Sequence, residues 1–325
     1  MNKKLLLITD LNQNDYIYFM KTSRRKFLIK TGTLLAAGLS IKHGVVLGSE
    51  NSMSKESKVN VGAHPWIYAA ELPPDYDISP VLDKIFQEIK YAGYDGVELM
   101  HHPLRNHKTT LVISDLKDRY GLPVIGTSYG ADMWDQSKHK EILDDVENII
   151  NNLAEVDGRT LGTSVGRAPE KKTEKQLDDQ ADLLKKIIDI GKNYGVVINL
   201  HNHTYEVEDD LHDLKGTLKR IPDIKLGPDL NWLLSGGVDP VDFLKKYGDQ
   251  IVFLHIRDEF KDGKWSESLG EGDVNFKAIG KTLKKIDFSG DLVVELAHEN
   301  DFEPTRPIRE SLKMSREYVK KTMGY

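Results

Sequence analysis

The chain has 325 residues, of which 39% are hydrophobic and 30% charged, and its formal net charge is −6. This length suits one large domain or two small ones, and the acidic balance gives no support for a nucleic-acid or anionic-membrane partner, which would require a basic stripe. The chain contains no cysteine, so disulfides and thiolate ligands are excluded, and any bound metal must be held by His, Asp or Glu.

Residues 1–48 are predicted to be an N-terminal extension rather than part of a folded domain. Within it, "SRRKFL" (23–28) places two arginines directly before a mildly apolar run, which resembles a twin-arginine signal peptide. Such signals start close to the initiator, so Met20 is the expected first residue, and the resemblance implies export to the periplasm. A basic amphipathic helix is the alternative. The apolar run is too short to predict a membrane span, and residues 49–57 are a polar linker.

From residue 58 to residue 325 the sequence alternates short apolar runs with longer segments of helical spacing. In two of these segments, 81–93 and 180–195, a glycine ends the helix shortly before the next apolar run. Alternating strands and helices predict parallel pairing, and eight such units match a closed (β/α)₈ barrel of ~250 residues in a single domain. An open doubly wound sheet is the alternative. The predicted strands are 59–63, 96–100, 122–128, 160–166, 196–201, 224–230, 251–257 and 292–297, and the last predicted helix is 307–323.

Alternation within these strands predicts which side chains face the barrel interior. In "IVFLHIR" (251–257) one face is wholly aliphatic and suits packing against helices, so His255 and Arg257 are expected to point inward. By the same alternation, Glu98 of the second strand and Glu295 of the eighth are expected to point inward.

Strands five to eight each end in a residue that can bind a metal. Their carboxyl ends meet at one mouth of a barrel, where barrel enzymes build their active sites, and a carboxylate there is costly unless it is paired or bound to a metal. Two imidazoles with two carboxylates suit one divalent ion, with Mn²⁺, Zn²⁺, Co²⁺ or Fe²⁺ favoured over Mg²⁺. In the alternative, the groups only hydrogen-bond one another in a polar plug. The predicted ligands are His201, Asp229, His255 and Glu295.

Further polar residues are expected around this site. The predicted catalytic residues are Glu295 and His203, either of which would take a proton, and Arg257, which would steady a substrate oxygen. Four more residues are predicted to contact the substrate: Glu98, His101, Glu206 and Trp232.

Several of these residues also have a structural interpretation. Glu98 is equally suited to pair with a barrel Arg or His, and Trp232 to pack at the barrel rim. Asp258 is expected to orient ligands or cap backbone groups. The glycines of "GEGD" (270–273) are expected to form a turn before a helix, with a phosphate cradle as the alternative.

Five segments, taken with their order and spacing, carry a family resemblance: "GYDGVEL" (93–99), "PDLNWLLSGGVDP" (228–240), "FLHIRD" (253–258), "GEGDVNF" (270–276) and "LVVEL" (292–296). They resemble the xylose isomerase-like barrels, which include sugar-phosphate isomerases, epimerases and inosose dehydratases. The resemblance implies a metal held by Glu, Asp, His and Glu from strands five to eight, and Asp229, His255 and Glu295 occupy matching positions. In two departures, His201 stands where a glutamate is common and Trp232 where a substrate-binding histidine is usual.

The resemblance implies a metal-dependent isomerase or epimerase that removes a proton next to the carbonyl of an unphosphorylated keto-sugar. The departure at His201 favours a second hypothesis, β-elimination from a 3-keto-glycoside, because elimination requires one base rather than a pair of glutamates. A third hypothesis is a non-catalytic periplasmic sugar-binding barrel. The expected partner is a small sugar, with no nucleic acid and no membrane span, and the sequence leaves open whether the chain forms a homo-oligomer.

Overall fold

The structure is a computed structural model and describes residues 59–299 and 302–325. The predicted signal peptide and the polar linker lie outside these residues. The described strands are β1 (Asn60–Ala63), β2 (Gly96–Met100), β3 (Val124–Gly130), β4 (Thr160–Ser164), β5 (Val197–Leu200), β6 (Lys225–Leu226), β7 (Phe253–Ile256) and β8 (Asp291–Val294).

All eight strands belong to one parallel sheet, in the order β6-β5-β4-β3-β2-β1-β8-β7. Two further parallel bridges, from Leu226 to Ile251 and from Asp229 to His255, join the ends of this order and close the sheet. The predicted (β/α)₈ barrel is therefore confirmed.

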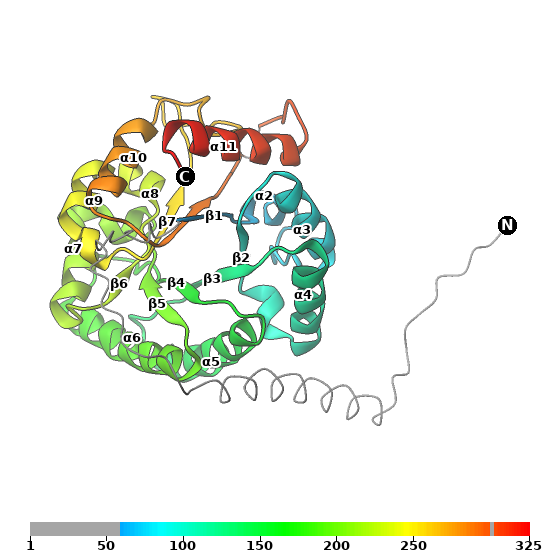
Figure 1. The fold of residues 1–325 in the computed structure, drawn as a ribbon. Coiled ribbons are helices and arrows are strands. Elements are labelled where there is room, and N and C mark those ends of the chain that lie inside the picture. Colours follow the sequence, from blue (N-terminus) through cyan, green and yellow to red (C-terminus); the bar gives the residue numbers. More distant parts are fainter. Residues whose placement is uncertain (1–58, 300–301) are drawn as a thin grey trace, which may run out of the picture. The chain divides into compact units, whose positions relative to one another are not determined.

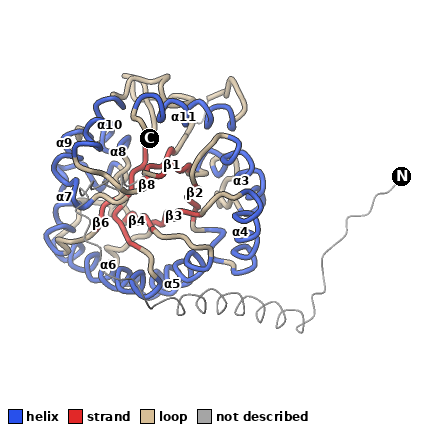
Figure 2. Tube along the Cα trace, viewed as in Figure 1, coloured by secondary structure: helices blue, strands red, loops and turns tan. Residues whose placement is uncertain are grey.

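Helices surround the barrel as an outer ring, and the strands lie inside it (Figures 1 and 2). The glycines predicted to end two of the helices do so: Gly93 and Gly195 have φ of 84° and 72°, values that favour glycine. The helices are α2 (Trp66–Ala69), α3 (Leu82–Tyr91), α4 (His107–Tyr120), α5 (His139–Glu155), α6 (Glu174–Tyr194), α7 (Thr204–Arg220), α8 (Leu230–Ser235), α9 (Pro240–Tyr247), α10 (Phe276–Lys285) and α11 (Ile308–Thr322), with short 3₁₀ segments at Ser79–Val81, His102–Arg105, Gln136–Lys138 and Gly248–Gln250.

The barrel interior has its own apolar layer, separate from the larger core between strands and helices. It consists of Ile125, Phe253 and Val293, which form a cluster of buried residues. Ile125 fits because Gly62 and Gly96 lack side chains: a Cβ at either position would lie 2.5 or 2.6 Å from an Ile125 carbon. This layer fills the barrel below the carboxyl ends of the strands and leaves those ends for polar groups.

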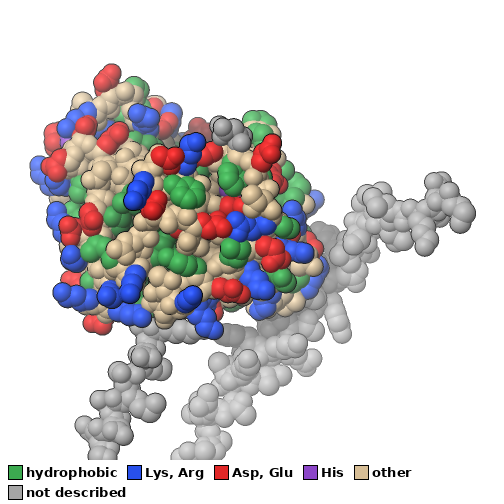
Figure 3. Space-filling view, turned by 90° about the horizontal axis from the view of Figure 1, so that it is seen from above, with side chains coloured by type: hydrophobic (Ala, Val, Ile, Leu, Met, Phe, Trp, Pro, Cys, Tyr) green, Lys and Arg blue, Asp and Glu red, His purple; other side chains and the backbone are tan. Residues whose placement is uncertain are grey.

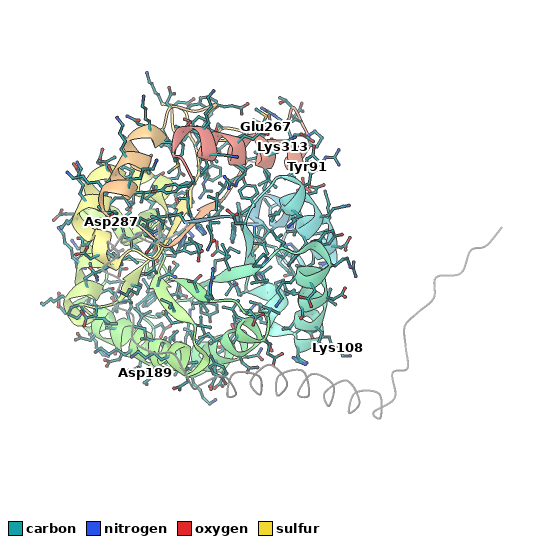
Figure 4. All side chains as sticks on the ribbon, viewed as in Figure 1. Tyr91, Lys108, Asp189, Glu267, Asp287 and Lys313 are labelled. Carbon is teal, nitrogen blue, oxygen red and sulfur yellow. The ribbon has the colours of Figure 1, made fainter. Side chains whose placement is uncertain are left out.

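Helices α3 and α11 of the ring are joined by contacts around Tyr91 of α3. The hydroxyl of Tyr91 donates a hydrogen bond to Glu310 (3.1 Å), and the Lys313 ammonium lies 5.4 Å from the centre of the tyrosine ring. Figure 4 labels Tyr91 and Lys313 side by side at the edge of α11. These contacts attach α11 to α3 and complete the ring of helices.

The sixth strand is shorter than the predicted span of 224–230, because only Lys225–Leu226 pair as a strand. Pro228 has no N–H to donate to a ladder, and Asp229 is already the N-cap of α8. The strand therefore ends before Asp229, and the side chain of Asp229 caps α8 instead.

The surface carries both signs of charge. On the face shown in Figure 3, lysine and arginine side chains are interspersed with aspartate and glutamate side chains. Within residues 59–299 and 302–325, no helix combines the length and the apolar character needed to cross a membrane.

Candidate active site

Three of the four predicted ligands lie together at the carboxyl ends of neighbouring strands. His201 follows β5, Asp229 follows β6 and His255 belongs to β7. One ligand atom from each lies within 4.8 Å of the others, and all three residues are buried. This triad is able to hold a metal ion.

Asp229 is held in place on every side. As the N-cap of α8, its Oδ1 accepts hydrogen bonds from the backbone N–H groups of Asn231 (2.8 Å) and Trp232 (3.1 Å). Its Oδ2 accepts from the Arg257 guanidinium (3.0 Å), and the side chain of Asn202 bonds both the N–H and the carbonyl of Asp229. The helix cap therefore fixes the direction of this carboxylate.

His255 lies between two carboxylates. Its Nε2 is hydrogen-bonded to Glu98, whereas its Nδ1 lies 2.9 Å from an oxygen of Glu295 without the geometry of a hydrogen bond. Burial alone would lower the pKa of His255, but the two carboxylates outweigh it and raise the pKa well above its usual value. Glu98 is buried beside the histidine, which favours the structural role considered for it over the predicted contact with substrate.

Glu295, the fourth predicted ligand, adjoins the triad. It lies near His255, and its oxygens are 3.9 Å from Nδ1 of His64 and 3.8 Å from the Arg257 guanidinium. Burial opposes ionisation, but the charges of His64, His255 and Arg257 outweigh it and hold the pKa of Glu295 well below its usual range. His64, at the end of β1, was not predicted. Alternation in "VNVGAHPW" places it inward with Gly62 and was the signal that could have found it.

The residues present fit a divalent cation. Burial lowers the pKa of His201 well below its usual value, so its imidazole is neutral and keeps a lone pair for a metal. The buried Nδ1 of His255 has no hydrogen-bond partner among the described residues. Three carboxylates, from Glu98, Asp229 and Glu295, surround the triad with a single guanidinium, and a bound cation would balance their charge in place of the proton on His255.

The side chain of Arg257 is almost completely buried beside two tryptophans. Its side chain is 2% exposed, and its guanidinium lies against two indoles that meet edge to face, 5.1 Å from the ring of Trp232 and 4.7 Å from that of Trp265. Nε1 of Trp265 donates to Asn231 (3.0 Å), whose amide in turn bonds Glu259. These contacts direct Arg257 toward Asp229 and Glu295, and its predicted contact with a substrate oxygen stays a prediction.

Trp265 was not predicted to belong to the site, and no pattern in the sequence pointed to it. It lies in the loop after β7, where Gly263 (φ 83°) permits a tight turn and Glu259 forms an antiparallel bridge with Trp265. Only the folded loop brings this indole over Arg257.

His203 is the most accessible of the predicted catalytic groups, with a side chain 39% exposed. Its ring lies 5.2 Å from that of His201, and its Nδ1 lies 3.2 Å from the Ser164 hydroxyl and 3.3 Å from that of Tyr205. Burial lowers the pKa of His203, but the adjacent Glu206 carboxylate outweighs it and raises the pKa above its usual value.

The carboxylate of Glu206 accepts hydrogen bonds from protein groups at the start of α7 and around the end of β4. One of its oxygens accepts from the Ser164 hydroxyl and from the N–H of Val165, and the other accepts from the N–H of His203 in a capping box. Since both oxygens are bound to protein donors, these contacts position His203. The predicted contact of Glu206 with substrate stays a prediction.

His101 lies after β2 and does not join the triad through any contact of the described residues. Its Nδ1 is 3.1 Å from the carbonyl of Ser128, its ring stacks on His102 at 4.1 Å, and burial lowers its pKa to about 4. Its predicted contact with substrate also stays a prediction.

The loop "GEGD" binds a carboxylate of the protein itself. Asp258 accepts hydrogen bonds from the N–H groups of Gly270 (2.8 Å), Gly272 (3.0 Å) and Val274 (3.1 Å). The predicted capping role of Asp258 is confirmed. These N–H groups are already occupied, so the alternative of a phosphate cradle is not supported.

A closed parallel barrel with polar ligands gathered at its carboxyl ends defines the (β/α)₈ class, whose enzymes place their active sites at that end. The chain belongs to the xylose isomerase-like TIM barrel family, whose sequence model matches residues 86–318.

Individual relatives are distant but similar over most of their length. An inosose dehydratase of Clostridium tetani is 21% identical over 304 residues, covering 82% of this chain and 98% of the relative. Among solved structures, a D-allulose 3-epimerase from Methylomonas sp. has a TM-score of 0.66 at 18% identity, covering 82% of this chain and 98% of that one. A 3-keto-D-glucoside 4-epimerase from E. coli has a TM-score of 0.64 at 19% identity, covering 80% and 100%.

Proposed function

We propose that this protein is a divalent-metal-dependent enzyme that removes a proton next to the carbonyl of an unphosphorylated keto-sugar. The observation that carries the proposal is the buried triad of His201, Asp229 and His255, with the carboxylate of Glu295 beside it. The named activities of the distant relatives, sugar epimerases and an inosose dehydratase, support the same class of chemistry.

The triad and Glu295 would hold the ion. When bound, such a cation would supply Lewis-acid stabilisation of negative charge on a carbonyl oxygen. Other parts of the protein hold the ligands ready for an ion, because the α8 cap fixes Asp229 and Glu98 fixes the ring of His255.

Glu295 and His203 are the two groups suited to move protons. Glu295 is held ionised by its cationic neighbours and can accept a proton, although only 12% of its side chain is exposed. His203 is more exposed, and its raised pKa keeps a proton available near neutral pH. A positioned acid or base of this kind typically contributes ~10²–10⁴-fold in rate.

The proposed substrate carries no phosphate. The guanidinium beside the triad, that of Arg257, is paired with Asp229 and lies against the rings of two tryptophans. A phosphate at the triad would require a free cation or free N–H groups there, whereas Arg257 is already paired and the N–H groups of the "GEGD" loop already bind Asp258.

A second candidate function is β-elimination from a 3-keto-glycoside. Elimination requires one base and an acid for the leaving group, and Glu295 with His203 supplies that pair. A two-carboxylate epimerase would instead require a second glutamate, and His201 stands at its place. The neutral imidazole of His201 can bind a metal but cannot replace that glutamate as a base.

One experiment tests both candidates. The purified protein, supplied with Mn²⁺, is incubated in D₂O with keto-sugars and oxidised glycosides, and the proton next to the carbonyl is followed by NMR. Exchange without release of an aglycone supports isomerisation or epimerisation, and release supports elimination. Turnover of a confirmed substrate with that proton neither exchanged nor lost would contradict the proposal. Absence of turnover across the series would favour the non-catalytic sugar-binding barrel.

A further inference from the structure

A polar cavity of about 170 Å³ lies beside the candidate active site. It is formed between the loop that follows β4, from Gly166 to Lys172, and the start of α7, from Tyr205 to Asp213. Neither segment belongs to the triad or to the contacts that hold it.

Tyr205 connects this cavity to the active site. Its ring stacks in parallel on His203, with centroids 5.3 Å apart, and the His203 ring lies 5.2 Å from that of His201. Tyr205 also lines the cavity. Through these ring contacts the cavity lies two side chains, Tyr205 and His203, from His201 of the triad.

Several charged side chains that line the cavity are unpaired in the described part of the chain. Within residues 59–299 and 302–325, none of the following five forms a hydrogen bond or an ion pair with another side chain: Arg167, Glu170, Lys171, Glu208 and Asp209. By contrast, Lys172 and Asp213 at the cavity edge are paired with each other. Donors and acceptors in nearly balanced numbers suit a neutral ligand with many hydroxyl groups better than an anion or a cation.

The backbone of α7 is distorted where it borders the cavity. Asp209, Asp210 and Leu211 have φ of 53°, 58° and 61°, although none is glycine and an uninterrupted helix would avoid such values. Non-glycine residues keep this conformation only where surrounding structure maintains it, and such positions concentrate at binding sites. The break moves Glu208 and Asp209 out of the helix, where they line the cavity.

We propose that the cavity is a subsite for a second sugar ring, so that the substrate is a glycoside whose oxidised ring lies at the triad and whose neighbouring ring lies against Tyr205 and Arg167. This inference rests on the proposed function and specifies its substrate class. It accounts for the polar lining and the break in α7, and it gives the exposed, unpaired side chains a ligand to bind.

The test measures binding with sugars that cannot react, so that it does not depend on the chemistry at the triad. The purified full chain is titrated calorimetrically with methyl glucoside, methyl maltoside and methyl cellobioside, none of which carries a free carbonyl group. Wild-type protein should bind at least one disaccharide about tenfold more tightly than methyl glucoside, as expected for added hydrogen bonds to charged groups.

Two variants address the cavity itself. Arg167→Ala removes an exposed, unpaired cation, and Asp209→Asn removes a charge while keeping a residue that tolerates the left-handed region. Each should remove most of the preference for the disaccharide and leave affinity for methyl glucoside unchanged. Lys281→Ala, at an exposed position on α10, is the matched control and should bind as wild type.

Equal affinity of the wild type for disaccharides and methyl glucoside would overturn the subsite, as would unchanged disaccharide affinity in both variants. Competition of inorganic phosphate with the disaccharide, lost in Arg167→Ala, would identify an anion site instead. If disaccharide binding behaves as expected while no keto-sugar exchanges its proton, the subsite stands and the proposed reaction fails.

Discussion

The carboxylate of Glu98 is hydrogen-bonded to Nε2 of His255, although the two residues are 157 positions apart in the chain. Glu98 belongs to β2 and His255 to β7, so the contact crosses the barrel interior. It fixes the orientation of the imidazole so that Nδ1 of His255 faces Glu295. A carboxylate in this position also makes a histidine a better metal ligand.

Glu98→Gln should therefore weaken metal binding without unfolding the barrel. Glutamine keeps the size of the side chain and one acceptor but loses the charge that orients the ring, and loss of such a partner typically weakens affinity by about ten- to a hundredfold. Calorimetric titration of the metal-free protein with Mn²⁺ or Zn²⁺ measures the effect. The exposed Glu147→Gln on α5 serves as the control, and equal metal affinity in both variants would exclude this role for Glu98.

Asp229 has two functions that different substitutions should separate. Asp229→Asn keeps an oxygen for the N–H groups of Asn231 and Trp232 but removes the charge, so bound metal should fall from about one ion per chain to a small fraction. Elemental analysis measures the content. Stoichiometric metal in this variant would remove Asp229 from the ligand set.

Asp229→Ala should lose the cap as well as the metal. Loss of the cap costs about 1 kcal/mol, and the Arg257 guanidinium is left without its closest carboxylate. Urea unfolding of both variants without metal should therefore find the alanine variant less stable than the asparagine variant. Equal stability would mean that the cap does not contribute.

Trp265 should stabilise the site through its ring and its N–H separately. Trp265→Phe keeps an aromatic face over Arg257 but loses the bond to Asn231, worth about 1 kcal/mol. Trp265→Leu also loses the cation–π contact, worth about 1–2 kcal/mol more when desolvated. The free energy of unfolding of the metal-free protein should fall in the order Trp, Phe, Leu. A leucine variant as stable as the phenylalanine variant would show that the stacking on Arg257 contributes nothing.

The buried pair of Lys172 and Asp213 offers a test of stability away from the triad. The two side chains are 4% and 8% exposed, and Gln180 bonds both of them. Lys172→Met leaves a buried carboxylate without its cation and should cost roughly 3–5 kcal/mol. Adding Asp213→Asn removes that charge but keeps an acceptor for Gln180, so the double variant should recover much of the loss. A double variant less stable than the single one would contradict this account.

Export is a prediction from residues 23–28, outside the described structure. In a bacterium with a twin-arginine pathway, the chain should reach the periplasm shorter than its full length, because the signal is removed on export. Arg24→Lys with Arg25→Lys should keep the protein in the cytoplasm at full length. Intact mass from fractionated cells measures both outcomes, and unchanged export of the double variant would exclude this signal.

Strand alternation was sufficient to predict that most of the candidate metal ligands point into the barrel. The side chains of a strand alternate with a period of two whatever their neighbours, so an aliphatic face in 251–257 was enough to direct His255 inward. Because parallel strands end together at one mouth, His201 and Asp229 could be placed beside it from sequence alone. His64 obeys the same rule and could have been found.

Only the tertiary structure decided what these residues touch. Trp265 reaches Asn231 and Arg257 through a folded loop, and Glu206 is turned to the N–H groups that begin α7. Neither contact follows a local periodicity, because each depends on how loops from different strands pack at the rim. The sequence by itself therefore determined the barrel and the inward direction of its ligands, which follow from backbone geometry. The partners of Glu98 and Arg257, and the cavity beside Tyr205, were decided by packing between segments distant in the chain.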